Sequence, residues 1–89
     1  MEKPLSDNLP TVLKNADVTQ AEFAELCGVR RVTVNLWCRG KMRPHQYIRS
    51  NVLSLVERVE HATSAGVLPL PRSVKRGDRL DALRQATTN

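Results

Sequence analysis

The feature that most constrains this 89-residue sequence is Gly28, which stands between two short helical patterns. Thr19 is followed three residues later by Glu22, the spacing of a capping box at a helix start. The residues between Glu22 and Gly28 place Phe23, Ala24 and Cys27 on one helical face. Glycine adopts positive φ without a steric penalty, so we expect this first helix to end at Gly28.

A second short helix is predicted after this turn, from about Arg30 to Arg39. Val29, Val34 and Trp37 form its apolar stripe, which places Trp37 in the core, and Gly40 is a second glycine at a helix end. Two short helices joined by so tight a turn match the helix-turn-helix unit, whose second helix enters the DNA major groove.

Residues 19–44 also resemble a known family. They read Thr-Gln-x-x-Phe-Ala-x-x-x-Gly-Val, then Val34, Trp37 and Arg39-Gly40-x-x-x-Pro44, which is similar to the Cro and phage-repressor (Xre-like) helix-turn-helix family. Arg30, Val32 and Cys38 depart from the residues usual there, namely a small capping residue, a polar base reader and an acid. These departures concern the DNA sequence preferred rather than the fold.

The chain on either side supplies further helices. Residues 5–16 carry Leu9, Val12, Leu13 and Ala16 at helical spacing, with Pro10 expected in the first turn. A long helix is predicted after Pro44, with Gly66 as its stop. Its apolar residues, Tyr47, Ile48, Val52, Leu53, Leu55, Val56, Val59 and Ala62, are too many for one face.

Beyond Gly66 the chain changes character. Two prolines, at 69 and 71, predict an extended segment, and a last short helix is expected over residues 77–86 with Asp78 as its cap. With the resemblance, these patterns imply an all-α fold: a lambda-repressor-like helix-turn-helix bundle of four to five helices with an extended C-terminal arm. We expect a DNA-binding domain over residues 1–66 and a dimerisation element over residues 67–89.

The charge distribution supports a nucleic-acid partner. The net charge is +5, yet no acidic residue lies between Glu25 and Glu57. That stretch holds Arg30, Arg31, Arg39, Lys41, Arg43 and Arg49. A run of charge is often only a solvated surface, but here it coincides with the second helix and its following loop, where phosphates would be neutralised.

The place of each residue along the second helix predicts which part of the DNA it contacts. Arg31 lies at the N-terminal end of the second helix and is our first candidate for a bidentate bond to guanine. Val32 and Leu36 have no donors, so they can only contact thymine methyl groups or exclude competing bases by shape, while Asn35 suits either adenine or the DNA backbone. The predicted DNA-binding residues are Thr19, Gln20, Arg30, Arg31, Val32, Thr33, Asn35, Leu36, Arg39, Lys41 and Arg43.

Surplus apolar residues predict a homodimer. They come from the long helix and from the arm, and are Val56, Val59, Val67, Leu68, Leu70, Leu80 and Leu83. An apolar arm needs a surface to cover it, either on its own domain or on a second copy, and we favour the second copy.

Other function classes find little support. There is no apolar run long enough for a membrane span, no signal-peptide pattern, no catalytic set and no metal-ligand spacing among Cys27, Cys38, His45 and His61. We expect no enzyme activity, cofactor, metal or disulfide, and a cytoplasmic location in a bacterial cell, on the nucleoid when DNA is bound. The prediction is a Cro-like repressor of a phage or plasmid, dimeric on an inverted-repeat operator of double-stranded DNA. The alternatives are an antitoxin that covers a toxin with its arm and an activator that contacts polymerase.

Overall fold

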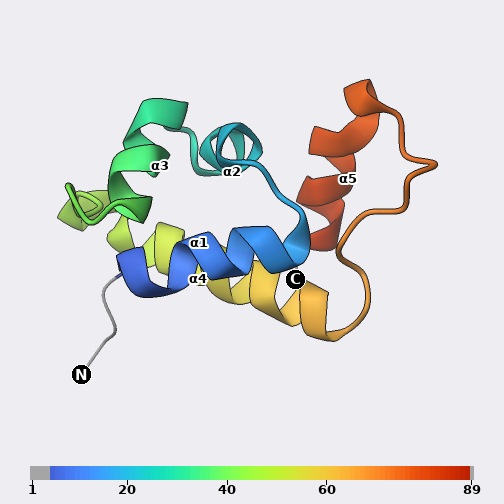
Figure 1. Ribbon diagram of the computed structural model, residues 1–89, viewed down its shortest axis with the longest axis horizontal. Helices are drawn as coiled ribbons and strands as arrows, with labels where there is room; N and C mark the ends of the chain where they lie inside the picture. The colour runs from blue at the N-terminus through green and yellow to red at the C-terminus, as the bar shows by residue number, and fades with distance from the viewer. Residues whose placement is uncertain (1–4, 89) are drawn as a thin grey trace.

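The structure, a computed structural model, describes residues 5–88. Within that range the chain forms five α-helices and one short 3-10 helix, and no strand. The elements are α1 (Leu5–Ala16), α2 (Gln20–Cys27), α3 (Arg31–Cys38), α4 (Gln46–Ser64), η1 (Arg76–Asp78) and α5 (Arg79–Ala86). The all-α fold predicted from the sequence is confirmed (Figure 1).

Helices α1 to α4 surround one core. The packed pairs are α1 with α3 and α4, and α2 with α3 and α4. The predicted apolar residues of α1 are all buried, namely Leu9, Val12, Leu13 and Ala16. Pro10 lies inside α1 rather than in its first turn as expected. Its side chain is exposed, and because proline has no N–H, α1 lacks one backbone hydrogen bond at this position.

The long helix α4 begins one residue after its cap, His45, so Pro44 precedes the helix instead of opening it. Its buried stripe is Val52, Leu55, Val56, Val59 and Ala62. Tyr47 was predicted in this stripe but is 81% exposed, because it lies on a different side of α4 from Val52, whereas Ile48 in the same turn packs against the core. Gly66, with φ 78°, follows the end of α4 as predicted.

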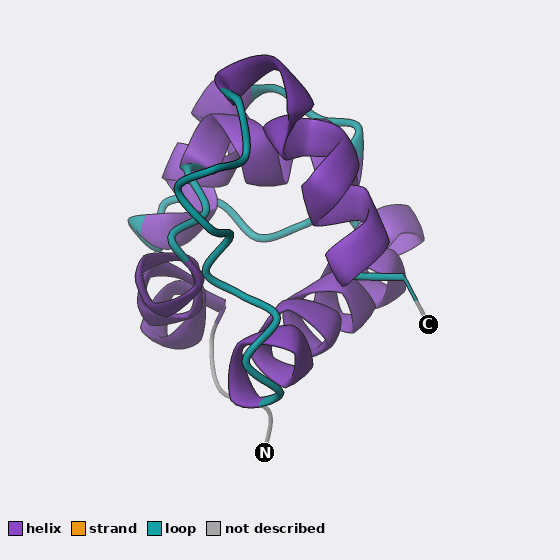
Figure 2. Ribbon diagram, turned by 90° about the vertical axis from the view of Figure 1, so that its right-hand side faces the viewer, coloured by secondary structure: helices purple, strands orange, loops and turns teal. Residues whose placement is uncertain are grey.

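The C-terminal segment returns to the same domain. An irregular linker leaves α4, crosses one end of the molecule and leads to η1 and α5 (Figure 2). Helix α5 packs on α2. Asp78 occupies the cap position of α5 but its side chain makes no capping hydrogen bond, because η1 already supplies a tight turn there.

The burial of this segment differs from our expectation of an arm on a second copy. Leu68 is 2% exposed and Leu83 is fully buried, both within the core cluster of a single chain. Val56 and Val59 of α4 belong to that cluster as well. These four residues therefore cannot form a dimer surface while the segment is docked in this way. Of the predicted dimer residues, Val67 is exposed, and Leu70 and Leu80 are half-buried.

Candidate nucleic-acid interface

The start of α2 is built as the sequence predicted. The Thr19 hydroxyl accepts a hydrogen bond from the Glu22 backbone N–H at 3.0 Å. The Glu22 carboxylate accepts one from the Thr19 backbone N–H, also at 3.0 Å. This reciprocal capping box supplies side-chain acceptors to two backbone N–H groups that have no carbonyl partner within the helix.

The turn between α2 and α3 depends on Gly28, which has φ 76°. The Val29 N–H donates to the Ala24 carbonyl at 3.0 Å and the Gly28 N–H donates to the Glu25 carbonyl at 3.3 Å. These bonds form a Schellman motif, which satisfies the last carbonyls of α2 and reverses the chain within a few residues. The helix-turn-helix geometry therefore rests on a residue that accepts positive φ.

One face of α3 is anchored in the core. Val34 is fully buried and Trp37 is 1% exposed, as predicted for both. At the start of the helix, the cap residue Arg30 and the first two residues of α3, Arg31 and Val32, have exposed side chains. With Trp37 anchored, the N-terminal end of α3 projects from the domain and is accessible to a large partner.

The predicted contact residues all lie on accessible surface. Seven side chains are exposed: Thr19, Arg30, Arg31, Val32, Arg39, Lys41 and Arg43. Four are half-buried: Gln20, Thr33, Asn35 and Leu36. They occupy the start of α2, the helix α3 and the loop after it, which follow one another along one side of the molecule (Figure 1).

A hydrogen bond that the sequence did not predict joins two of these residues. The Asn35 amide Nδ2 donates to Gln20 Oε1 at 3.1 Å. It links the first turn of α2 to the middle of α3 and leaves the Gln20 amide nitrogen able to donate outward. The hydrogen bond fixes the orientation of both amide side chains, which lowers the conformational entropy lost when either contacts a ligand.

The basic loop after α3 is also ordered by backbone bonds. Lys41 N–H donates to the Leu36 carbonyl at 2.9 Å, around Gly40. The charged side chains of Arg39, Lys41 and Arg43 stay in solvent. A fixed backbone that carries mobile cations suits contact with phosphates, which need charge more than a set geometry.

His45 and Tyr47 form an aromatic pair at the start of α4 that sequence reasoning missed. The Tyr47 N–H donates to His45 Nδ1 at 3.3 Å, and the rings stack with centroids 4.9 Å apart. Tyr47 exposes its phenol beside the basic loop, where its hydroxyl can donate to a phosphate. The only sequence signal was its position two residues after His45, the cap of α4.

The cysteines offer no reactive site. Both are free, and burial raises the pKa of the Cys27 thiol to about 12 and raises that of Cys38 as well. A protonated thiol is a poor nucleophile and a poor metal ligand. In the described part of the chain no group of three or more His, Cys, Asp or Glu is placed to hold a metal ion. No helix over residues 5–88 has the length and apolar character needed to cross a membrane.

Comparison with known proteins matches the part of the chain that holds the helix-turn-helix unit. A family model described as helix-turn-helix matches residues 11–47, from the second half of α1 to the first turn of α4. No curated protein and no solved structure matches the chain. The matched family is one of DNA-binding regulators and not of enzymes. Residues 67–89, including α5, lie outside the match.

Proposed function

Because residues 11–47 form a helix-turn-helix domain of the Cro and phage-repressor type, we propose that this protein is a transcriptional regulator that binds a specific duplex operator through α3. One observation carries the proposal. The N-terminal end of α3 exposes Arg30 and Arg31, while Val34 and Trp37 hold the same helix in the core. A recognition helix needs one face packed in the protein core and exposed side chains that can enter the DNA groove.

The proposed base readout centres on Arg31. Its side chain is exposed in the first turn of α3, the part of the helix that approaches base edges in this docking geometry. Val32, 57% exposed, fits a thymine methyl group, and so does Leu36 if the groove closes around it. Because Asn35 already donates to Gln20, we assign it to the DNA backbone or to orientation of Gln20 in preference to adenine.

The proposed phosphate contacts flank the readout on both sides. Thr19 and Gln20 lie at the start of α2, where backbone N–H groups and the helix dipole favour an anion. Arg30 and Thr33 lie on α3, and the loop supplies Arg39, Lys41 and Arg43. With no acidic residue over positions 26–56, nothing in this segment repels the DNA backbone.

We propose that the protein acts as a homodimer on an inverted repeat whose half-sites lie about one helical turn apart, and that it represses transcription. Val67, Leu70 and Leu80 remain candidates for its contact surface. The alternative is an antitoxin that binds its operator and covers a toxin with the segment beyond Gly66. We place it second because Leu68 and Leu83 of that segment are buried within one chain.

The test is a gel-shift titration on the protein's own upstream DNA and on random duplex, each at two salt concentrations, with sedimentation of the same sample. A preference of about 10³-fold or more for the upstream fragment, together with a dimer in solution, supports an autoregulatory repressor. Equal and steeply salt-dependent binding to both duplexes would contradict sequence-specific recognition there. Absence of binding to either duplex at low salt would contradict DNA binding itself.

A further inference from the structure

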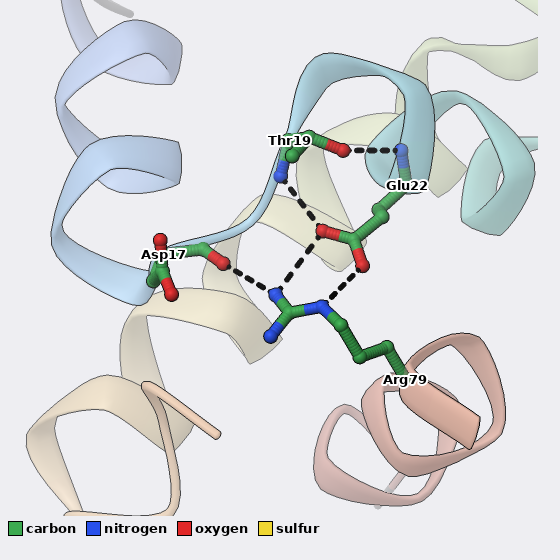
Figure 3. A network of polar contacts seen from close by, with 4 residues as sticks. All are labelled: Asp17, Thr19, Glu22 and Arg79. Atoms are coloured by element: carbon green, nitrogen blue, oxygen red, sulfur yellow. Dashed lines mark hydrogen bonds and ion pairs between the residues drawn. The ribbon is translucent and has the colours of Figure 1, made fainter. Parts of the chain in front are cut away.

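An arginine of α5 contacts the helix-turn-helix unit from outside the matched segment. Arg79 Nε lies 2.8 Å from Glu22 Oε2, and Arg79 Nη2 donates to Glu22 Oε1 at 3.3 Å (Figure 3). The same Nη2 donates to the Asp17 carbonyl at 2.8 Å. The two charged side chains are 22% and 17% exposed, so this pair is better shielded from water than an ordinary surface ion pair.

The carboxylate that Arg79 holds is the one that caps α2. Glu22 accepts from the Thr19 backbone N–H and from Arg79 at the same time. Partial burial by itself raises the pKa of Glu22, but the hydrogen bonds from Arg79 and Thr19 together bring that pKa below its ordinary value. Glu22 is therefore a full negative charge at neutral pH, and Arg79 compensates it.

The charge of Glu22 lies beside the residues proposed to contact a phosphate. Thr19 and Gln20, the residues proposed to meet a phosphate, share the first turn of α2 with Glu22. Gln20 in turn accepts a hydrogen bond from Asn35 of α3. Without Arg79, the uncompensated carboxylate would repel a phosphate, and the junction between α1 and α2 would lose its bond to the Asp17 carbonyl.

We propose that Arg79 is a positioning residue for DNA binding: from α5 it holds the first turn of α2 in place and neutralises Glu22, so that phosphate can approach Thr19 and Gln20. This inference rests on the proposed function. It assigns the C-terminal segment a role in DNA affinity, in addition to its role in covering the core. Arg79 itself need not touch the DNA.

The test compares variants of the full chain by fluorescence anisotropy on the upstream duplex at several salt concentrations, with circular dichroism to establish folding at the assay temperature. Arg79→Ala should weaken binding about tenfold and leave the salt slope unchanged, because Arg79 neutralises Glu22 and not a phosphate. A salt slope lowered by about 1 would make Arg79 a direct phosphate contact and overturn the positioning role. Arg84→Ala is the matched control, because Arg84 lies on the same helix and, within residues 5–88, its ion pair is with exposed Asp81 at 3.6 Å. It removes the same charge and should change affinity less than about twofold.

A rescue separates positioning from simple loss of stability. Glu22→Gln keeps a side chain that can complete a capping box but removes the charge. In an Arg79→Ala background it should recover about half or more of the lost affinity on a logarithmic scale. A merely structural role would lower the melting temperature and leave the affinity of folded protein unchanged.

Two further results would decide the matter. If folded Arg79→Ala binds like the unaltered protein, or if Arg84→Ala loses as much affinity, the inference is wrong. Should Arg79→Ala fail to fold, Arg79→Lys keeps the charge without the paired bonds to Glu22 and Asp17, and unchanged affinity of that variant would overturn the positioning role. Failure of the unaltered protein to bind either duplex would instead refute the proposed function, so the two failures are distinguishable.

Discussion

The buried indole of Trp37 leads to our sharpest stability prediction. Trp37 is 1% exposed, and its Nε1 is buried without a hydrogen-bond partner among the described residues. A buried donor without a partner destabilises the folded state by about 1–3 kcal/mol. Replacing Trp37 with phenylalanine removes that donor, while replacing it with alanine removes the whole side chain.

The two substitutions should differ widely in free energy of unfolding. Trp37→Ala should cost about 3–5 kcal/mol, the usual range for truncating a buried tryptophan. Phenylalanine is smaller by about 40 Å³, which costs about 1 kcal/mol at about 24 cal/mol per Å³, with a similar loss of transfer free energy. Removal of the unpaired N–H offsets most of this. We therefore expect Trp37→Phe to change the free energy of unfolding by about 1 kcal/mol or less.

The assay is urea unfolding followed by far-UV circular dichroism, because Trp37 is the only tryptophan and fluorescence is lost in both variants. Phe23→Leu is a control: Phe23 is fully buried and its side chain has no polar atom to remove. That control should cost more than Trp37→Phe. A loss above about 2.5 kcal/mol for Trp37→Phe would refute the reasoning and mean that the indole N–H is hydrogen-bonded in solution.

Three other outcomes are expected. Arg31→Ala should weaken specific DNA binding by about 1–3 kcal/mol and relax preference at one base pair, measured by gel shift on operator variants; equal loss on every sequence would make it a phosphate contact. Gly28→Ala should cost about 1 kcal/mol in urea unfolding, because φ is 76° while nothing lies within 4 Å of the added carbon; an unchanged midpoint would contradict this. Since the hydrogen bonds from Arg79 and Thr19 lower the pKa of Glu22 in the folded state, the stability that Glu22 contributes should be present above its unfolded pKa and be lost as the pH falls through the lower pKa of the folded state. Glu22→Gln should flatten that acid dependence, and an identical pH profile would refute it.

Much of the helix-turn-helix unit could be predicted because its signals are local. The capping box joins residues three apart, and the Schellman turn at Gly28 depends on one residue's φ. The burial of Val34 and Trp37 follows from helical period alone. Such features need no knowledge of what packs against the helix.

The contacts that were missed join residues distant in sequence. Arg79 and Glu22 are 57 positions apart, and no charge pattern marks Arg79 out from its neighbours Arg76 and Arg84. Gln20 and Asn35 are 15 apart, and their hydrogen bond depends on how α2 crosses α3. Tyr47 was counted in the apolar stripe of α4, which has more members than one face can hold, and only the packing shows that Ile48 faces the core while Tyr47 faces solvent.

The sequence by itself therefore determined the helices, the capping box and glycine stop of α2, and the basic character of α3 and its loop, because each depends on neighbouring residues. Only the tertiary structure decided where the C-terminal segment packs. The same apolar residues, Leu68 and Leu83, would suit a second copy or their own domain, since burial of apolar surface is favourable without direction. The directional bonds from Arg79 to Glu22 and to the Asp17 carbonyl accompany that burial and fix α5 against α2.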